Sequence, residues 1–237
     1  MSTLLDDIEA FNRKERYFLF TYAANGDSSF PLSAKFREEL GGQLGIEIPA
    51  DAKGYIDYHL DWIHAAVFLA SRNAGDGPHD NLRPGAQKTG NPRDWQRVST
   101  GNQEDIDLVV AFEQDGITWL VLVEAKGVGS WTNKQVQSKL RRLRNIDSDM
   151  TPEAKASIQL RLCLASPKES LGLVPEADTQ WPEWMIHPVK KRPYWINLPV
   201  PGGRKKVTGC TETGTSANTR EYWKVESVSS KDLVDGE

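Results

Sequence analysis

Apolar residues recur at helical spacing through the first third of the chain, which predicts amphipathic helices there. The candidate helices cover residues 6–22, 33–44 and 58–72. Ser33 is expected to cap the second helix and Gly45 to end it, because a hydroxyl suits the N-cap position and glycine suits the left-handed conformation after the last turn. The first third is therefore expected to be mostly helical.

The middle of the chain begins with a segment rich in Gly, Pro, Asn and Asp, residues 73–104, which predicts a long loop of the kind that is often functional or mobile. Two apolar runs follow, at residues 106–112 and 117–123. Asp115-Gly116 lies between them, and Asp-Gly between β-branched apolar runs is a strong signal for a β-hairpin. We therefore expect two antiparallel neighbouring strands here.

After the hairpin, residues 133–145 are expected to form a basic helix, and residues 158–165 alternate as a strand does. Beyond Pro167 the sequence becomes rich in Pro and Trp. It contains three short strand candidates, at residues 194–198, 205–210 and 221–228. The alternation of helices and strands predicts an α/β protein with a β-rich C-terminal addition.

Composition limits the classes of protein that this chain can represent. Its 237 residues, 38% of them hydrophobic, suffice for a large domain with an ordinary core. Two cysteines are too few for a disulfide framework, and no apolar run approaches the length of a membrane span. The beginning of the chain is acidic rather than basic and then apolar, so we expect a cytoplasmic protein without a membrane partner.

A net charge of −4 gives no overall attraction to nucleic acid, so any phosphate-binding surface must be local. The segment 134–144 is such a candidate, because it holds five basic residues and no acid. Its apolar residues Val136, Leu140 and Leu143 form a stripe that is expected to face the core. The side chains expected to contact a nucleic-acid backbone from the other faces are Lys134, Lys139 and Arg142.

An acidic residue, any residue and a lysine follow one another three times in the chain, at positions 51–53, 124–126 and 153–155. Chance alone predicts about two such matches, so the pattern by itself carries little information. Context separates Glu124-Ala125-Lys126 from the others, because only this copy ends an apolar strand of the predicted hairpin.

Strand geometry brings several charges of this hairpin to one end of it. Glu124 and Lys126 share a face, because side chains alternate along a strand. Asp107 begins the antiparallel neighbour and is therefore expected close to Glu124. Two carboxylates with one ammonium lack one positive charge, and burying them unbalanced is costly. A hard divalent cation such as Mg²⁺ would supply that charge.

These residues resemble the PD-(D/E)xK nuclease superfamily, which has the restriction-endonuclease-like fold. Asp107 matches the aspartate of its motif and Glu124-Ala125-Lys126 matches the remainder, while Ile106 stands where the family's name has proline. The resemblance implies an αβββαβ core with a mixed sheet, N-terminal helical additions and a β-rich C-terminal addition. The expected divisions are an N-terminal helical segment at 1–56, a nuclease core at 57–166 and a C-terminal extension at 167–237.

The resemblance also implies a reaction, the hydrolysis of phosphodiester bonds to leave a 5′-phosphate. Asp107, Glu124 and the carbonyl of Ala125 would hold Mg²⁺, for which Mn²⁺ substitutes, and Lys126 would orient or activate the attacking water. The implied partner is nucleic acid, with DNA favoured over RNA. A homodimer would be required for symmetric cleavage of both strands.

Two further positions of the family have candidates here. An acid on a helix before the sheet, which would join the metal ligands, matches either Glu15 or Asp61. A catalytic glutamine or lysine on the helix after the motif matches Gln135, although Thr132-x-x-Gln135 is also the pattern of a capping box.

Several alternatives remain open from the sequence. Asp57, His59 and Asp61 would share a face on a strand and bind a metal independently, whereas on a helix that begins near Tyr58 the cluster dissolves and Asp57 is an N-cap. The motif residues can also be a solvated strand end of an unrelated α/β protein. A nuclease-like fold can finally serve as an inactive module that binds nucleic acid or a protein.

Overall fold

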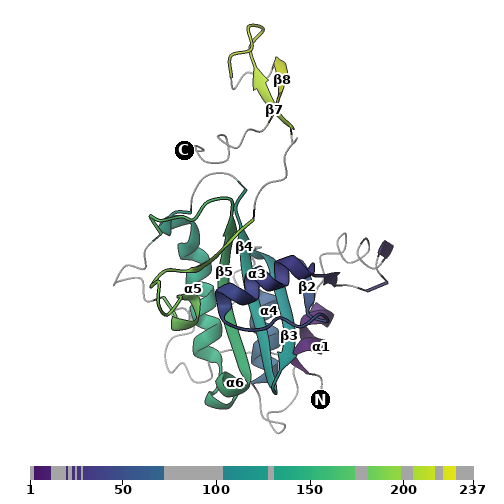
Figure 1. Ribbon diagram of the computed structural model, residues 1–237, viewed down its shortest axis with the longest axis vertical. Helices are drawn as coiled ribbons and strands as arrows, with labels where there is room; N and C mark the ends of the chain where they lie inside the picture. The colour runs from purple at the N-terminus through teal and green to yellow at the C-terminus, as the bar shows by residue number, and fades with distance from the viewer. Residues whose placement is uncertain are drawn as a thin grey trace, which may run out of the picture.

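The computed structural model describes residues 3–11, 20, 23–24, 26–27, 29–71, 104–127, 131–173, 181–198, 205–216 and 221–227. It is an α/β structure in which helices cover both faces of a mixed six-stranded sheet (Figure 1), as the sequence predicts for the class. The helices are α1 (Leu4–Phe11), α3 (Ala34–Leu44), α4 (Leu60–Ala70), α5 (Asn133–Asp149), α6 (Pro152–Ser157) and the 3-10 helix η3 (Glu183–Met185). The strands are β1 (Phe30–Pro31), β2 (Lys53–His59), β3 (Asp105–Gln114), β4 (Ile117–Ala125), β5 (Ile158–Ser166), β6 (Tyr194–Asn197), β7 (Lys205–Cys210) and β8 (Tyr222–Ser227).

The order of strands in the large sheet is the order of the chain, from β1 to β6. The strands β1, β2, β3 and β4 pair antiparallel in turn, whereas β5 runs parallel to β4, and β6 runs parallel to β5. The C-terminal ends of β2, β4, β5 and β6 therefore lie at one edge of the sheet together with the N-terminal end of β3. We call this edge the motif edge, because Asp107 and Glu124 lie there.

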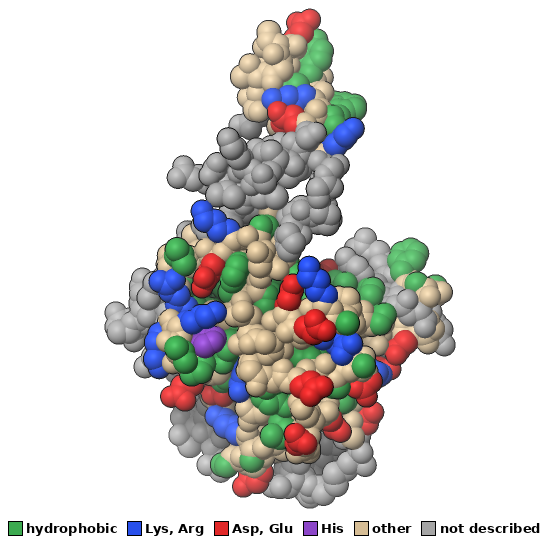
Figure 2. All heavy atoms as spheres, viewed as in Figure 1, with side chains coloured by type: hydrophobic (Ala, Val, Ile, Leu, Met, Phe, Trp, Pro, Cys, Tyr) green, Lys and Arg blue, Asp and Glu red, His purple; other side chains and the backbone are tan. Residues whose placement is uncertain are grey.

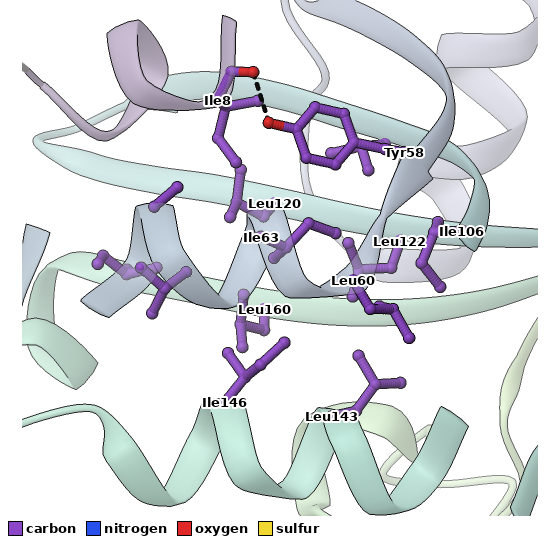
Figure 3. Close-up of a cluster of buried hydrophobic side chains, with 14 of the residues drawn as sticks. Ile8, Tyr58, Leu60, Ile63, Ile106, Leu120, Leu122, Leu143, Ile146 and Leu160 are labelled. Atoms are coloured by element: carbon purple, nitrogen blue, oxygen red, sulfur yellow. Dashed lines mark hydrogen bonds between the residues drawn. The ribbon is translucent and has the colours of Figure 1, made fainter. Parts of the chain in front are cut away.

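The core occupies both faces of the sheet. On one face, α1, α4 and α5 pack over the strands (Figure 3), and the Tyr58 hydroxyl donates a hydrogen bond of 2.6 Å to the carbonyl of Ile8 in α1. On the other face, α3 packs over a second cluster that includes Val121, Val123 and Cys163. Burying each large aliphatic side chain stabilises the fold by roughly 1.5–3 kcal/mol, so the two clusters fix the position of the sheet between its helices.

The hairpin and the second helix form for the local reasons that the sequence indicates. Asp115 and Gly116 have φ angles of 52° and 75°, as the two central residues of a type I′ turn require. Ser33 caps α3, since its side chain accepts a hydrogen bond from the amide of Phe36, and Gly45 ends the helix at a φ of 69°. The predicted basic helix and the strand after it are confirmed as α5 and β5.

The third predicted helix begins later than expected, because β2 continues as far as His59. The prediction that Asp57 caps this helix is therefore wrong. The cap is His59, whose Nδ1 accepts a hydrogen bond of 3.2 Å from the amide of Asp61. The division expected between residues 56 and 57 falls inside β2. Of the first predicted helix, residues 6–11 form part of α1 and residues 12–19 lie outside the described ranges, as does nearly all of the predicted loop at 73–104.

The three C-terminal strand candidates are confirmed as β6, β7 and β8. The first joins the large sheet, so that sheet continues beyond the division expected after residue 166. The other two form a separate two-stranded sheet, and Figure 2 shows hydrophobic side chains on the surface of this hairpin. These exposed residues are Val207, Tyr222, Trp223 and Val225. None of the helices that the structure describes is long and apolar enough to cross a membrane.

Two adjacent glycines in α3 are expected to respond oppositely to alanine. A Cβ on Gly41 would lie 2.5 Å from the backbone oxygen of Ile46, so Gly41→Ala should lower the free energy of unfolding by about 1–3 kcal/mol. Gly42 has nothing within 4 Å of the same position, and Gly42→Ala should raise it by up to about 1 kcal/mol. Urea denaturation of both variants measures the difference, and equal effects would contradict the close approach of α3 to Ile46.

Candidate active site

Asp107 lies where the pairing of β3 with its neighbours is interrupted. The ladder between β2 and β3 pairs Ile56 with Leu108 and Tyr58 with Ile106, and omits Asp57 and Asp107 between them. Asp57 has a left-handed backbone there, with a φ of 54°. The Asp107 carboxylate accepts a hydrogen bond of 2.7 Å from the amide of Ala125 at the end of β4. Asp107 thus fastens the two strands of the hairpin together at the motif edge.

The carbonyl of Ala125 points to the same side as Asp107. The amide of Lys126 donates a hydrogen bond of 2.8 Å to the carbonyl of Ala165 in β5. In a trans peptide the C=O of one residue points away from the N–H of the next, so the Ala125 carbonyl points away from β5 and toward β3. Two oxygen donors, the Asp107 carboxylate and this carbonyl, therefore lie on one side of the β4 end.

Glu124 shares a face with Leu120 and Leu122, the face that α5 covers. Its side chain is only 4% exposed and accepts a hydrogen bond from the Lys139 ammonium of α5. Burial raises the pKa of Glu124 to about 7, against the lowering effect of Lys139 and with a smaller upward contribution from the charge of Asp107. The two carboxylates of the motif are therefore close enough to influence one another.

Lys126 follows β4 directly and is partly buried. Its ammonium lies 5.5 Å from the ring centroid of Trp131, close enough for a cation–π interaction. Trp131 is itself held by its backbone amide, which donates a hydrogen bond of 2.7 Å to the Ser170 hydroxyl. The indole thereby restrains the lysine at the motif edge.

The charge deficit expected from the sequence is absent, because Lys139 supplies the second positive charge. Its ammonium bonds to Glu124 and donates a hydrogen bond of 2.7 Å to the carbonyl of Asp105. Lys139 was expected on a solvated face as a phosphate contact. Its spacing from the buried residues Val136, Leu140 and Leu143 is the signal that could have placed it beside the core-facing stripe, since residues three and four apart share a helix face.

The side chain of Arg142, which was predicted to contact a nucleic-acid backbone, is only 8% exposed and is held in ion pairs within the protein. It lies 2.8 Å from Asp61 and 3.0 Å from Glu104, measured from guanidinium nitrogen to carboxylate oxygen. Asp61, one of the two candidates for a helix-borne metal ligand, is thus engaged by a buried guanidinium. Glu104 was not singled out from the sequence, since it ends a long segment without periodicity.

The remaining predicted site residues are described only in part. Gln135 and Lys134 lie in the first turn of α5, and their side chains are outside what the structure describes. Glu15 lies outside the described residues altogether. Among the residues that are described, no three His, Cys, Asp or Glu side chains form a group able to hold a metal, so the structure does not assemble Asp57, His59 and Asp61 into an independent site.

The other two copies of the acidic-x-lysine pattern lie in different surroundings. Glu153 and Lys155 belong to the short helix α6, where residues two apart do not share a face. Lys53 bonds to Glu9 at 2.7 Å, and Asp51 is exposed in the turn before β2. Among the described residues, only the copy at Glu124 and Lys126 lies at the C-terminal end of a strand and beside a carboxylate of the paired strand.

The donor set of the motif edge suits a hard divalent cation. Asp107, Glu124 and the Ala125 carbonyl all offer oxygen, and Mg²⁺ is typically held by one or two carboxylates with water and phosphate completing its shell. Glu124 is paired with Lys139, and Lys126 follows the Ala125 carbonyl directly in the chain.

Comparisons of the chain with protein-family models, with curated proteins and with solved structures found no match.

The raised pKa of Glu124 predicts a particular dependence of stability on pH. A carboxyl whose pKa is higher in the folded than in the unfolded state favours folding at low pH, and this contribution is lost as pH rises from about 4.5 to about 7. Glu124→Gln should therefore become progressively more stable relative to wild type over this interval. Urea denaturation of both proteins between pH 4 and 8 measures the difference, and a constant difference would contradict the shift.

Proposed function

We propose that this protein is a Mg²⁺-dependent nuclease that hydrolyses phosphodiester bonds, with DNA as its expected substrate. One observation carries the proposal: the Asp107 carboxylate is hydrogen bonded to the Ala125 amide beside buried Glu124, with Lys126 next in the chain. Two acids, a backbone carbonyl and a lysine at one strand end are the groups that metal-assisted attack on a phosphodiester requires.

The topology supports assignment to the restriction-endonuclease-like fold. Strands β2, β3 and β4 form an antiparallel run, α5 follows, and β5 returns parallel to β4. This agrees with the order of three strands, a helix and a strand in the αβββαβ core that the resemblance implies. The arrangement departs from that order by the helix α4 between β2 and β3 and by the short helix α6 between α5 and β5.

Each residue of the motif edge has a distinct role in the proposed reaction. Asp107, Glu124 and the Ala125 carbonyl would hold Mg²⁺, which when bound neutralises phosphate charge and lowers the pKa of a water. Lys126 would orient the attacking water and stabilise the negative charge that develops on the phosphorus oxygens. The cation–π contact with Trp131 would keep this ammonium in place while the substrate enters.

The test is cleavage of labelled single- and double-stranded DNA and RNA in Mg²⁺ or Mn²⁺, against EDTA. Wild type should cut at least one substrate only with metal, and Lys126→Met should lose this cleavage while retaining its fold. The double variant Glu153→Gln/Lys155→Met alters the same pattern on α6 and should cut as wild type does. Metal-independent cleavage, or undiminished cleavage by Lys126→Met, would refute the proposal.

A second candidate is an inactive nuclease-like module that binds nucleic acid or a protein partner. The ion pair between Lys139 and Glu124 favours it, because a site already balanced in charge does not demand a metal. Binding without cleavage of any substrate, unchanged by EDTA and by Lys126→Met, would support this second function.

A further inference from the structure

We propose that the Lys139 ammonium occupies the place of a divalent cation at Glu124, so that metal and Lys139 compete for this carboxylate. The inference rests on the proposed function, since it concerns the residues that would hold Mg²⁺ there. It assigns to Lys139 a positioning role in the control of metal loading, in place of the simple phosphate contact that its charge suggests.

The contacts of Lys139 are those of a resident cation. Its ammonium bonds to one carboxylate oxygen of Glu124 and, at 2.7 Å, to the carbonyl oxygen of Asp105. Glu124 is 4% exposed and Lys139 is 21% exposed, so the pair is largely withdrawn from water. An all-oxygen environment with a carboxylate and a backbone carbonyl is also what a hard divalent cation selects.

The rest of α5 holds Lys139 in this position. Leu140 and Leu143 on the same helix are almost fully buried against the sheet. Arg142, one residue before Leu143, is anchored by Asp61 and Glu104. Val136, three residues before Lys139, is also buried, so the helix is packed on both sides of Lys139 and the flexible part is its four-carbon side chain.

The charges around Glu124 explain why a bound metal would displace Lys139. Without metal, the charge of ionised Glu124 is matched by that of Lys139, and the motif adds one further acid, Asp107, and one further lysine, Lys126, so its formal charges balance. A dication bound by the same carboxylates would repel the ammonium at short range, and such repulsion is strong in a partly buried site. The ammonium would then swing outward, where it adds to the positive charge that faces a phosphodiester.

The arrangement therefore couples metal binding to substrate binding. The metal-free site is neutral and offers little attraction to phosphate, whereas the loaded site carries two additional positive charges and a released ammonium. A phosphodiester in the site would stabilise both the bound metal and the released ammonium. Nucleic acid should therefore raise the affinity for metal, and metal should raise the affinity for nucleic acid.

Metal affinity of the full-length protein tests the competition without reference to cleavage. Mn²⁺ is titrated by calorimetry at pH 8.5 into wild type, Lys139→Met, Lys139→Arg and Lys155→Met. Lys139→Met should bind Mn²⁺ at least about tenfold more tightly than wild type, because the repelled charge is gone. Lys139→Arg, which keeps the charge, should bind Mn²⁺ no more tightly than wild type. The control Lys155→Met should bind it as wild type does.

A spectroscopic measurement on wild type covers the case in which Lys139→Met does not fold. The ¹H–¹⁵N signal of the Lys139 ammonium should be protected without metal and should lose that protection when Mg²⁺ is added. The Lys155 signal should not respond to the metal. The Lys139 signal is assigned by its loss in Lys139→Arg.

The outcomes separate the two proposals. If metal binds but Lys139→Met binds it equally or more weakly, or if the ammonium stays protected in Mg²⁺, Lys139 merely supports Glu124 and the competition is refuted. If no variant binds Mn²⁺ at all, the proposed metal-dependent function itself fails. Loss of binding in Glu124→Gln, with the competition confirmed, would assign the metal to this carboxylate.

Discussion

Replacing Asp107 by asparagine is expected to abolish cleavage while leaving the fold intact. The asparagine side-chain oxygen can still accept the hydrogen bond from the Ala125 amide, so the hairpin remains fastened at the motif edge. The negative charge that would bind Mg²⁺ is lost. The rate should fall by more than the roughly 10- to 100-fold that loss of an outer-shell partner of a metal typically costs.

The measurement is the initial rate of cleavage in Mg²⁺, together with the melting temperature of each protein. Asp115→Asn is the matched control, because it makes the same substitution in the turn at the opposite end of the same hairpin, where asparagine also tolerates a positive φ. If Asp107→Asn cuts as fast as wild type, Asp107 only holds β3 and β4 together and does not bind the metal.

Replacing Arg142 by methionine is expected to destabilise the protein by about 3–5 kcal/mol. The change leaves Asp61 and Glu104 partly buried without the guanidinium that balances them, and breaking a buried ion pair from one side has this cost. The Asp61 and Glu104 side chains are 18% and 19% exposed, so water relieves only part of it. Urea denaturation at pH 7 measures the loss.

Arg141 provides the control for this experiment, since it neighbours Arg142 on the helix and is exposed. Arg141→Met should change the free energy of unfolding by no more than about 0.5 kcal/mol. An Arg142→Met protein as stable as wild type but weaker in binding nucleic acid would restore the phosphate contact that the sequence suggests for Arg142.

Local patterns were sufficient to predict the elements whose causes are local. The Asp115-Gly116 turn, the Ser33 cap and the strand β5 each depend on a few neighbouring residues, and each was confirmed, although burial alternates only over the first half of β5. The strand β2 was missed because apolar residues continue from it into α4 without a breaker, and helical spacing was extended backward to Tyr58. Tertiary pairing with β3, which no local pattern reveals, decides that boundary.

The sequence predicted that Asp107 and Glu124 lie close together, but it did not predict which residues of α5 contact Glu124 and Asp61. Asp107, Glu124 and Lys126 follow from strand geometry, because a hairpin places the end of one strand beside the start of the other. The partners of Glu124 and Asp61 depend on how α5 is rotated against the sheet. A basic run suggests solvent exposure, yet Lys139 and Arg142 turn inward because the buried stripe beside them sets that rotation.

The parallel pairing of β4, β5 and β6 limits how far the C-terminal hairpin can lie from the motif edge. Asn197 ends β6 two strands away from β4, which is about 10 Å at the usual strand spacing. From Leu198 to the start of β7 at Lys205 a chain can extend by at most about 25 Å. Lys205 therefore lies within about 35 Å of Lys126, and the exposed Trp223, which pairs with Gly209 four residues farther along β7, lies within about 50 Å, the length of roughly fifteen base pairs of duplex. A duplex cut at the motif edge and contacted by Trp223 would have a footprint on that side no longer than about one and a half helical turns of DNA.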